Sequence, residues 1–149
     1  MPEGPEAKRA DPFVEDYLLY LLARASAQVS AQFHAVVKAR GLNVLEWRVL
    51  GSTSDSARSI GELDDITLAQ QPTLTKVIDR MERAGWVRRT RDASDRRRVL
   101  VEVTAKGRAT VDDLLGEAKR HEQQSLAGYT ADEAAALKKT LRKLIARTS

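Results

Sequence analysis

The sequence predicts a mainly α-helical fold with one small β-hairpin, in which two short helices and the hairpin lie between long helices at both ends. Apolar residues recur at three- and four-residue steps over most of the chain, which is typical of amphipathic helices. In a single stretch, 99–103, valines at every second position alternate with Leu100 and Glu102, and this stretch follows a turn-forming segment. With 149 residues the chain is expected to form one domain over 1–149.

The first long helix is predicted over residues 11–40. Its apolar stripe runs from Val14 to Val37 without an internal glycine or proline, and Gly41 is expected to end it. A helix of roughly 27 residues would be about 40 Å long. Because this exceeds what a small core needs, part of it is expected to pack against a second subunit. Residues 1–10 are polar and contain two prolines, and we expect a flexible leader there.

Two short helices are expected next. Asn43 has the side chain of an N-cap and Glu46 follows three residues later, so a helix is predicted there with its inward face at Val44, Trp47 and Leu50. Ser59 and Glu62 have capping-box spacing and predict a second short helix, with an inward face formed by Ile60, Leu63 and Ile66.

A further helix is expected to open at Pro72, where a missing N–H group costs nothing, with either Gln70 or Gln71 as the flanking residue. Its apolar face is predicted at Leu74, Val77, Ile78 and Met81. Its opposite face is polar and carries Thr73, Thr75, Lys76, Asp79, Arg80 and Arg83. Gly85 is expected to end this helix.

The predicted hairpin, 86–103, is strongly basic. Between Trp86 and Arg98 there are six arginines and two aspartates, a net charge of +4 that equals the formal charge of the whole chain. A polar helix that precedes a basic hairpin is typical of nucleic-acid readers, in which the helix contacts base edges and the hairpin contacts the backbone or the minor groove. Residues 43–103 are therefore predicted to form a winged helix-turn-helix lobe.

Two more helices are expected in 104–149, capped by Thr104 and by the Thr130 capping box. Together with 11–40 they are predicted to be dimerisation helices, because their apolar stripes exceed the needs of one small core. The expected stripes are Val111, Leu114, Leu115 and Ala118 in the first helix, and Leu137, Leu141, Leu144 and Ile145 in the second.

The candidate DNA contacts lie on the Pro72 helix and on the hairpin tip. On the helix they are Gln70, Gln71, Thr73, Thr75, Lys76 and Arg80; the last lies further along and is expected to meet either phosphate or a local carboxylate. The alternative for these side chains is a solvated helix face, and Gln70 and Gln71 could also serve only as caps. On the hairpin the candidates are Arg96, Arg97 and Arg98, of which at least one is expected to have a structural role.

At this point the sequence resembles the MarR family of winged-helix transcription regulators, from about Val14 to Ile145. The resemblance is carried by QPTLTKVIDRMERAGWVRR at 71–89, DASDRRR at 92–98, TAKG at 104–107 and LEWRVL at 45–50. It implies a homodimeric repressor on a pseudopalindromic double-stranded DNA operator, with the Pro72 helix in the major groove. The family's Asp-x-Arg wing signature falls on Asp95 and Arg97, which implies that Arg97 enters the minor groove and that Asp95 orients the wing arginines. From the residues alone, Arg96 and Arg97 are not separated.

The resemblance also implies release by a small anion, often aromatic or phenolic, bound between the DNA-binding lobe and the dimer helices. The candidates for such a pocket are His34, Arg40, Trp47 and Arg48. For Trp47, which lies on the apolar face of its helix, core packing is favoured over a place in the pocket wall, and the alternative for the arginines is a solvated helix face. The chain departs from the family pattern at Asp64-Asp65, and because it has no cysteine it does not resemble the peroxide-sensing branch.

Other classes of protein lack support in the sequence. There is no phosphate loop, dinucleotide-binding glycine motif, nucleophile elbow or metalloprotease motif, and the two histidines are far apart, so we expect no catalytic residue, no metal site and no cofactor. No apolar run is long enough to span a membrane, and a cytoplasmic protein is expected. The rival to a specific regulator is a nonspecific or architectural nucleic-acid binder that has no effector.

Overall fold

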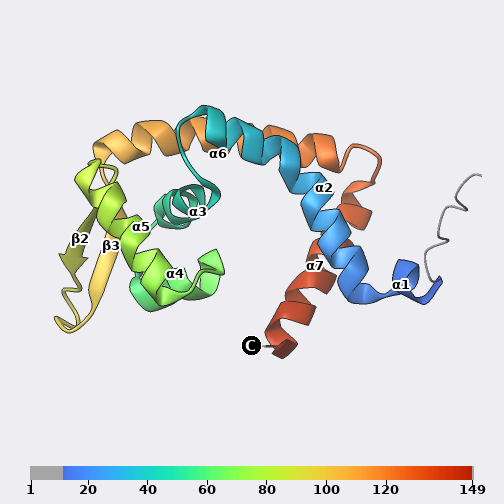
Figure 1. Cartoon of the computed structure of the whole chain (residues 1–149), viewed down its shortest axis with the longest axis horizontal. Coiled ribbons are helices and arrows are strands. Elements are labelled where there is room, and N and C mark those ends of the chain that lie inside the picture. Colours follow the sequence, from blue (N-terminus) through green and yellow to red (C-terminus); the bar gives the residue numbers. More distant parts are fainter. Residues whose placement is uncertain (1–11, 149) are drawn as a thin grey trace, which may run out of the picture.

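The structure is a computed structural model that describes residues 12–148. It is mainly helical, with a small sheet at one end, and the elements appear in Figure 1. The leader expected over residues 1–10 lies outside the described residues. In chain order the elements are α1 (Pro12–Asp16), α2 (Leu18–Ala39), α3 (Val44–Thr53), β1 (Arg58–Ser59), α4 (Ile60–Thr67), α5 (Gln71–Arg83), β2 (Val87–Arg91), β3 (Val99–Val103), α6 (Ala105–Ser125) and α7 (Ala131–Thr148).

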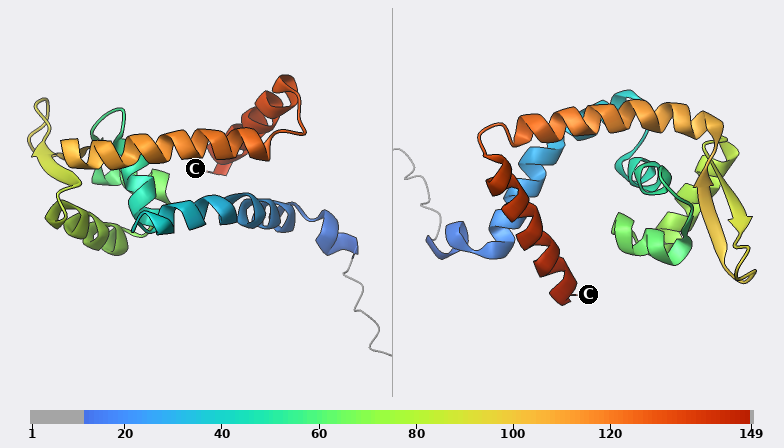
Figure 2. Two further views of the ribbon diagram at one scale, coloured as in Figure 1. Left: turned by 90° about the horizontal axis from the view of Figure 1, so that it is seen from above. Right: turned by 180° about the vertical axis from the view of Figure 1, so that it is seen from behind.

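The molecule has two parts joined by two long helices. Helices α3, α4 and α5 and the sheet lie at one end, while α1 and α7 lie at the other, and α6 runs between the two ends (Figure 1). Seen from above, α2 and α6 extend side by side toward α1 and α7 (Figure 2). The predicted order of a long helix, a winged helix-turn-helix and two further helices is confirmed.

The expected first helix is interrupted, so the prediction of one continuous helix over 11–40 is wrong. Tyr17 has extended backbone angles, φ −74° and ψ 125°, and separates α1 from α2. The rings of Phe13 in α1 and Tyr17 stack with their centroids 5.3 Å apart. Gly41 follows α2 with φ +76°, as expected of a glycine just beyond a helix end.

The N-cap expected at Asn43 and the capping box expected at Ser59 are confirmed, and Asn43 also forms a capping box with Glu46. In α4, Leu63 is buried as predicted, but Ile66 is exposed, which corrects the expected inward face. The buried residue at the end of α4 is Thr67, whose hydroxyl donates to the Leu63 carbonyl over 2.6 Å and so needs no solvent. Between α4 and α5, Gln70 is the N-cap, which resolves the choice left open at the Pro72 helix.

The wing contains a third strand that the periodicity did not predict. The strand order is β1-β3-β2, antiparallel throughout, with Arg58 opposite Val101 and Arg89 also opposite Val101 on the other side. Because β1 has only two residues, it shows no alternation that a pattern could reveal. Pairing with β1 places β3 in the centre of the sheet, so the hairpin is joined to the start of α4.

The hydrophobic core lies under the helix-turn-helix and the root of the wing. It consists of the fully buried faces of α3, α4, α5 and α6 together with the ends of α2 and the strands, and its members are Phe33, Val37, Leu42, Val49, Leu50, Leu63, Leu74, Val77, Ile78, Met81, Val87, Val101, Val111 and Leu114. The whole apolar face predicted for the Pro72 helix is in this core.

The terminal helices bury little apolar surface within one chain. Helix α7 contains no buried residue, and the apolar side chains of α1, α2 and α7 form an exposed surface whose large members are Phe13, Val14, Tyr17, Leu18, Leu19, Tyr20, Leu21, Val29, Leu137, Leu141 and Ile145. An apolar surface of this extent marks an interface with another molecule.

Candidate nucleic-acid interface

The first turns of α5 present polar side chains to solvent. Gln70, Gln71, Thr73, Thr75 and Lys76 are all exposed, while Leu74 and Val77, which alternate with them, are buried in the core. Within residues 12–148, none of these five polar side chains has a hydrogen-bond or ion-pair partner. The structure therefore places five of the six candidates at the start of this helix in solvent, with their side chains free of internal partners in the described chain.

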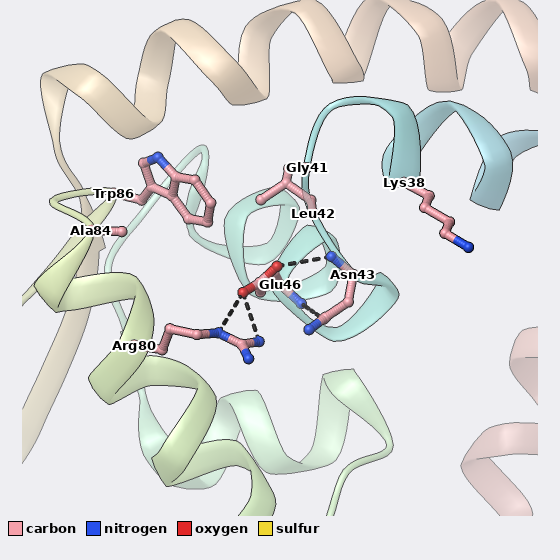
Figure 3. A pocket seen from close by; sticks show the side chains of 8 residues that line it. All are labelled: Lys38, Gly41, Leu42, Asn43, Glu46, Arg80, Ala84 and Trp86. Carbon is pink, nitrogen blue, oxygen red and sulfur yellow. Dashed lines mark hydrogen bonds and ion pairs between the residues drawn. The ribbon is translucent and has the colours of Figure 1, made fainter.

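The sixth candidate, Arg80, is bound internally. Its Nε and Nη2 atoms lie 2.8 and 2.7 Å from Oε1 of Glu46, a residue that is almost fully buried (Figure 3). The other carboxylate oxygen of Glu46 accepts the backbone N–H of Asn43 over 2.8 Å. Of the two partners expected for Arg80, the local carboxylate is the one that the structure contains. This charge-assisted pair fastens α5 to the start of α3.

The wing is fastened to α5 by another arginine. Arg89 on β2 donates to the carboxylates of Asp79 and Glu82, at 2.6 and 2.5 Å. Partial burial lowers the pKa of the Arg89 guanidinium, but its hydrogen bonds to the two carboxylates outweigh burial and raise the pKa overall. Arg89 thus remains charged and holds the wing against α5.

Most of the remaining wing arginines also have internal partners. Arg88 pairs with Glu102 across the strands at 2.5 Å, and Arg91 donates to the carbonyl of Arg96 over 2.9 Å. Arg98 lies 3.4 Å from Asp92 and 3.5 Å from Glu62 of α4, so it has the structural role expected of at least one of the tip arginines.

Two arginines at the tip of the wing have side chains without an internal partner in the described chain. Arg96 and Arg97 are exposed, and over the described part of the chain their guanidinium groups have no acceptor. Because the two side chains are alike in this respect, the geometry of one chain does not choose between them. These two adjacent guanidinium groups are therefore the positive charges of the wing that remain available to bind another molecule.

Asp95 organises the wing differently from the expectation. Its carboxylate accepts the backbone N–H of Arg97 over 3.0 Å, and its carbonyl accepts the N–H of Arg98 over 2.9 Å. The arginine side chain at the tip is instead bound by Asp92, whose pKa is lowered by hydrogen bonds from Ser94 and by the charge of Arg98. Asp95 therefore orients the turn by accepting backbone N–H groups rather than by pairing with arginine side chains.

The four expected effector residues do not meet in one cavity. Arg40 pairs with Asp113 of α6, and Arg48 donates to the Thr67 carbonyl over 3.0 Å. Trp47 packs edge-on against Phe33, with ring centroids 5.2 Å apart, which agrees with its alternative as a core residue. His34 is only half-buried.

Two cavities lie near these residues. One of about 590 Å³ separates the end of α2 from α3 and α5, and is lined by Lys38, Gly41, Leu42, Asn43, Glu46, Arg80, Ala84 and Trp86 (Figure 3). The other, of about 160 Å³, is the α2–α6 cavity, lined by Gln32, Phe33, Val36, Glu117, Arg120, His121 and Gln124. The ring of His121 in α6 lies 5.7 Å from that of Phe33 in α2. No local signal in the sequence connects two residues that lie so far apart along the chain.

For residues 12–148, neither a cluster of potential metal ligands nor a helix long and apolar enough to cross a membrane is present.

Comparison with known proteins agrees with the geometry. A family model described as "MarR family" matches residues 40–98. A MarR family transcriptional regulator from Silicibacter pomeroyi is 40% identical and superposes with a TM-score of 0.82 over 93% of this chain and 100% of that one. The chain belongs to the MarR family.

Two further MarR-type relatives bear on function. The homoprotocatechuate degradative operon repressor of Escherichia coli is 26% identical over 134 residues, which cover 89% of this chain and 90% of that protein. The structure of Bordetella bronchiseptica BpsR, described as regulated in its DNA binding by 6-hydroxynicotinic acid, is 27% identical with a TM-score of 0.73, over 87% of this chain and 94% of that one. As a MarR family member, the chain is a winged-helix transcription regulator.

Proposed function

We propose that this protein binds a pseudopalindromic DNA operator as a homodimer and represses transcription from it. The observation that carries the proposal is the unoccupied polar surface on the first turns of α5, which lies beside a wing with two arginines that have no internal acceptor in the described chain. Polar side chains at the start of a recognition helix are the ones that reach base edges in the major groove. The homoprotocatechuate operon repressor of Escherichia coli supports repression as the outcome.

On DNA, α5 would enter the major groove with Gln70, Gln71, Thr73 and Thr75, and Lys76 would meet phosphate. The tip of the wing would reach the neighbouring minor groove, where Arg96 or Arg97 would insert. Arg80 and Arg98, both bound to carboxylates in this chain, would hold the reading elements in position instead of contributing most of the contact energy.

The dimer would form through the exposed apolar surface of α1, α2 and α7. A second copy is the partner of choice because MarR-type regulators place two recognition helices on one operator. Half-sites would then lie about 34–36 Å apart, one helical turn of DNA. We place the protein in the cytoplasm with its DNA, and we assign it no enzymatic activity.

We further propose that a small aromatic acid releases the DNA, as 6-hydroxynicotinic acid regulates BpsR. The α2–α6 cavity suits one aromatic ring, because Phe33 and His121 line it. Arg120 lines it too and pairs with Glu117 over 2.5 Å, so an acid bound there would replace Glu117 as the partner of Arg120. A ligand there would contact α2 and α6, the helices that join the DNA-binding lobe to the dimer helices. Arg120→Gln should raise the acid concentration that releases DNA, whereas Lys119→Gln, an exposed neighbour, should not.

The experiment that tests DNA recognition is a comparison of affinities at about 150 mM salt. The duplexes are the region upstream of the protein's own gene, the best sequence selected from a random library, and scrambled controls. A specific regulator should prefer its selected site by roughly 10³-fold or more. Equal affinity for all duplexes would instead identify the nonspecific or architectural binder, which uses the wing as an electrostatic clamp.

A further inference from the structure

The turn between α4 and α5 contains a leucine in an unfavourable backbone conformation. Leu68 has φ +60° and ψ +23°, and in the described part of the chain it is the one residue other than glycine with a positive φ. The β-carbon of an L-residue is crowded in this left-handed region, where glycine and asparagine are the usual occupants. The backbone therefore gives no reason for a leucine at this position.

Two hydrogen bonds hold the turn in this conformation. The Thr67 hydroxyl, fully buried, donates to the Leu63 carbonyl over 2.6 Å, and Arg48 of α3 donates to the Thr67 carbonyl over 3.0 Å. Because the last residue of α4 is fixed on both sides, the chain reaches Leu68 in a direction set by the core. Strain of this kind persists where the surroundings determine it, and it occurs preferentially at functional positions.

The side chain at this strained position lies in solvent. Leu68 is 81% exposed, more than any other large exposed apolar residue in the described chain. The side chain is not part of the core, so neither packing nor the backbone conformation explains why this residue is a leucine. Gln70, the N-cap of α5, follows two residues later, so Leu68 immediately precedes in the chain the polar residues proposed to read bases.

The major groove offers one apolar group to such a side chain, the 5-methyl group of thymine. The glutamine and threonine side chains of α5 match hydrogen-bonding base edges, but none of them is a large apolar group. We propose that Leu68 is a specificity residue that packs against a thymine methyl at the edge of each half-site. This contact rests on the proposed operator binding and adds to it a preference that hydrogen bonds alone do not supply.

The test deletes the methyl group from the DNA and the leucine from the protein. In the selected operator, each thymine is replaced by deoxyuridine, symmetrically in both half-sites, and the affinity is measured for the wild type and for Leu68→Asn. Asparagine tolerates the left-handed backbone, so this variant should keep or gain thermal stability. The control is Ile66→Gln, which removes a neighbouring exposed apolar side chain from the body of α4.

For the wild type and Ile66→Gln, replacement of one symmetric pair of thymines by deoxyuridine should weaken binding. Burial of one methyl group is worth about fourfold in affinity, and so about 15-fold for the two half-sites together. Leu68→Asn should bind the thymine operator more weakly by a similar factor and lose the difference between thymine and deoxyuridine at that pair.

Two results would overturn the contact: a wild type insensitive to every replacement, or a Leu68→Asn variant that keeps the full thymine preference while binding both duplexes more weakly. A protein with no sequence preference would yield no selected operator, so failure of the proposed function is visible before this comparison begins.

Discussion

Substitution of Gly107 by alanine should destabilise the fold sharply, because the root of the wing leaves no space for a β-carbon. Gly107 is the third residue of α6, and a Cβ built on it would lie 2.1 Å from the carbonyl oxygen of Trp86 and 2.8 Å from Cγ2 of Val103. The Trp86 carbonyl cannot move freely, since it accepts the N–H of Thr104 over 3.0 Å. To admit the methyl group, α6 must shift away from the wing.

That shift breaks two hydrogen bonds and distorts a tight site, and these costs give the magnitude. Overpacking of a tight site costs about 1–3 kcal/mol. Loss of the N-cap, in which the Thr104 hydroxyl accepts the N–H of Gly107 over 3.1 Å, costs about 1 kcal/mol, and loss of the Thr104–Trp86 hydrogen bond costs about 1 kcal/mol more. We expect Gly107→Ala to lower the free energy of unfolding by about 3–5 kcal/mol.

The measurement is urea unfolding of the dimer at fixed protein concentration, with Gly116→Ala as the matched control. Gly116 lies on the same helix, and a Cβ there would meet nothing within 4 Å. The control should gain about 1 kcal/mol from helix propensity. The reasoning would be refuted if Gly107→Ala unfolded within about 1 kcal/mol of the wild type, or if both substitutions had the same sign. A steric origin also explains why the Thr-Ala-Lys-Gly segment ends in glycine.

Three further predictions concern two DNA contacts and the stability of the fold. Arg97→Ala should weaken operator binding by about tenfold or more with an unchanged melting temperature. Arg142→Ala on α7 is the control and should leave the affinity unchanged. An equal loss of affinity in both variants would mean that Arg97 acts only through the overall charge of the protein. Lys76→Ala should reduce the slope of log affinity against log salt by about 0.9 for each phosphate that the lysine neutralises, and an unchanged slope would return Lys76 to a solvated face. Hydrogen bonds from the backbone and hydroxyl of Ser59, with help from Arg98, lower the pKa of Glu62 below its usual 4.5. Its charge therefore stabilises the fold above that pH and loses this effect as the pH falls through the folded value. The difference in melting temperature between wild type and Glu62→Gln should consequently shrink from pH 7 to pH 3, and a constant difference would contradict this cause.

The elements that depend on local pattern were predictable from the sequence. The apolar face of α5 from Leu74 to Met81 follows from three- and four-residue spacing, and the capping boxes at Asn43 and Ser59 follow from side chains three residues apart. The exposed polar surface at the start of α5 is the complement of that apolar face. Periodicity thus located the surface proposed to read DNA.

Features that depend on distant partners were not predictable in this way. Arg40, Arg48, Arg80 and Arg98 look alike in the sequence, but the structure gives each of them an internal acceptor. Most of those acceptors lie on other elements, whose relative placement is set by the whole core. For the same reason, no periodic pattern in the sequence indicates the short strand β1 or the left-handed turn at Leu68.

The internal partners of these arginines also determine how an effector can act. Arg89 fastens the wing to α5, Arg80 fastens α5 to α3, and Arg98 fastens the hairpin tip to α4. The packing of Gly107 against Trp86 then joins the wing root to α6. A ligand between α2 and α6 would therefore move the recognition helix and wing together, and it would release DNA by changing the spacing of two intact lobes in the dimer. We expect hydrogen exchange within α5 and β2 to be unaltered by such a ligand, while the distance between the two copies of α5 changes; ligand-induced loosening of α5 itself would contradict this rigid coupling.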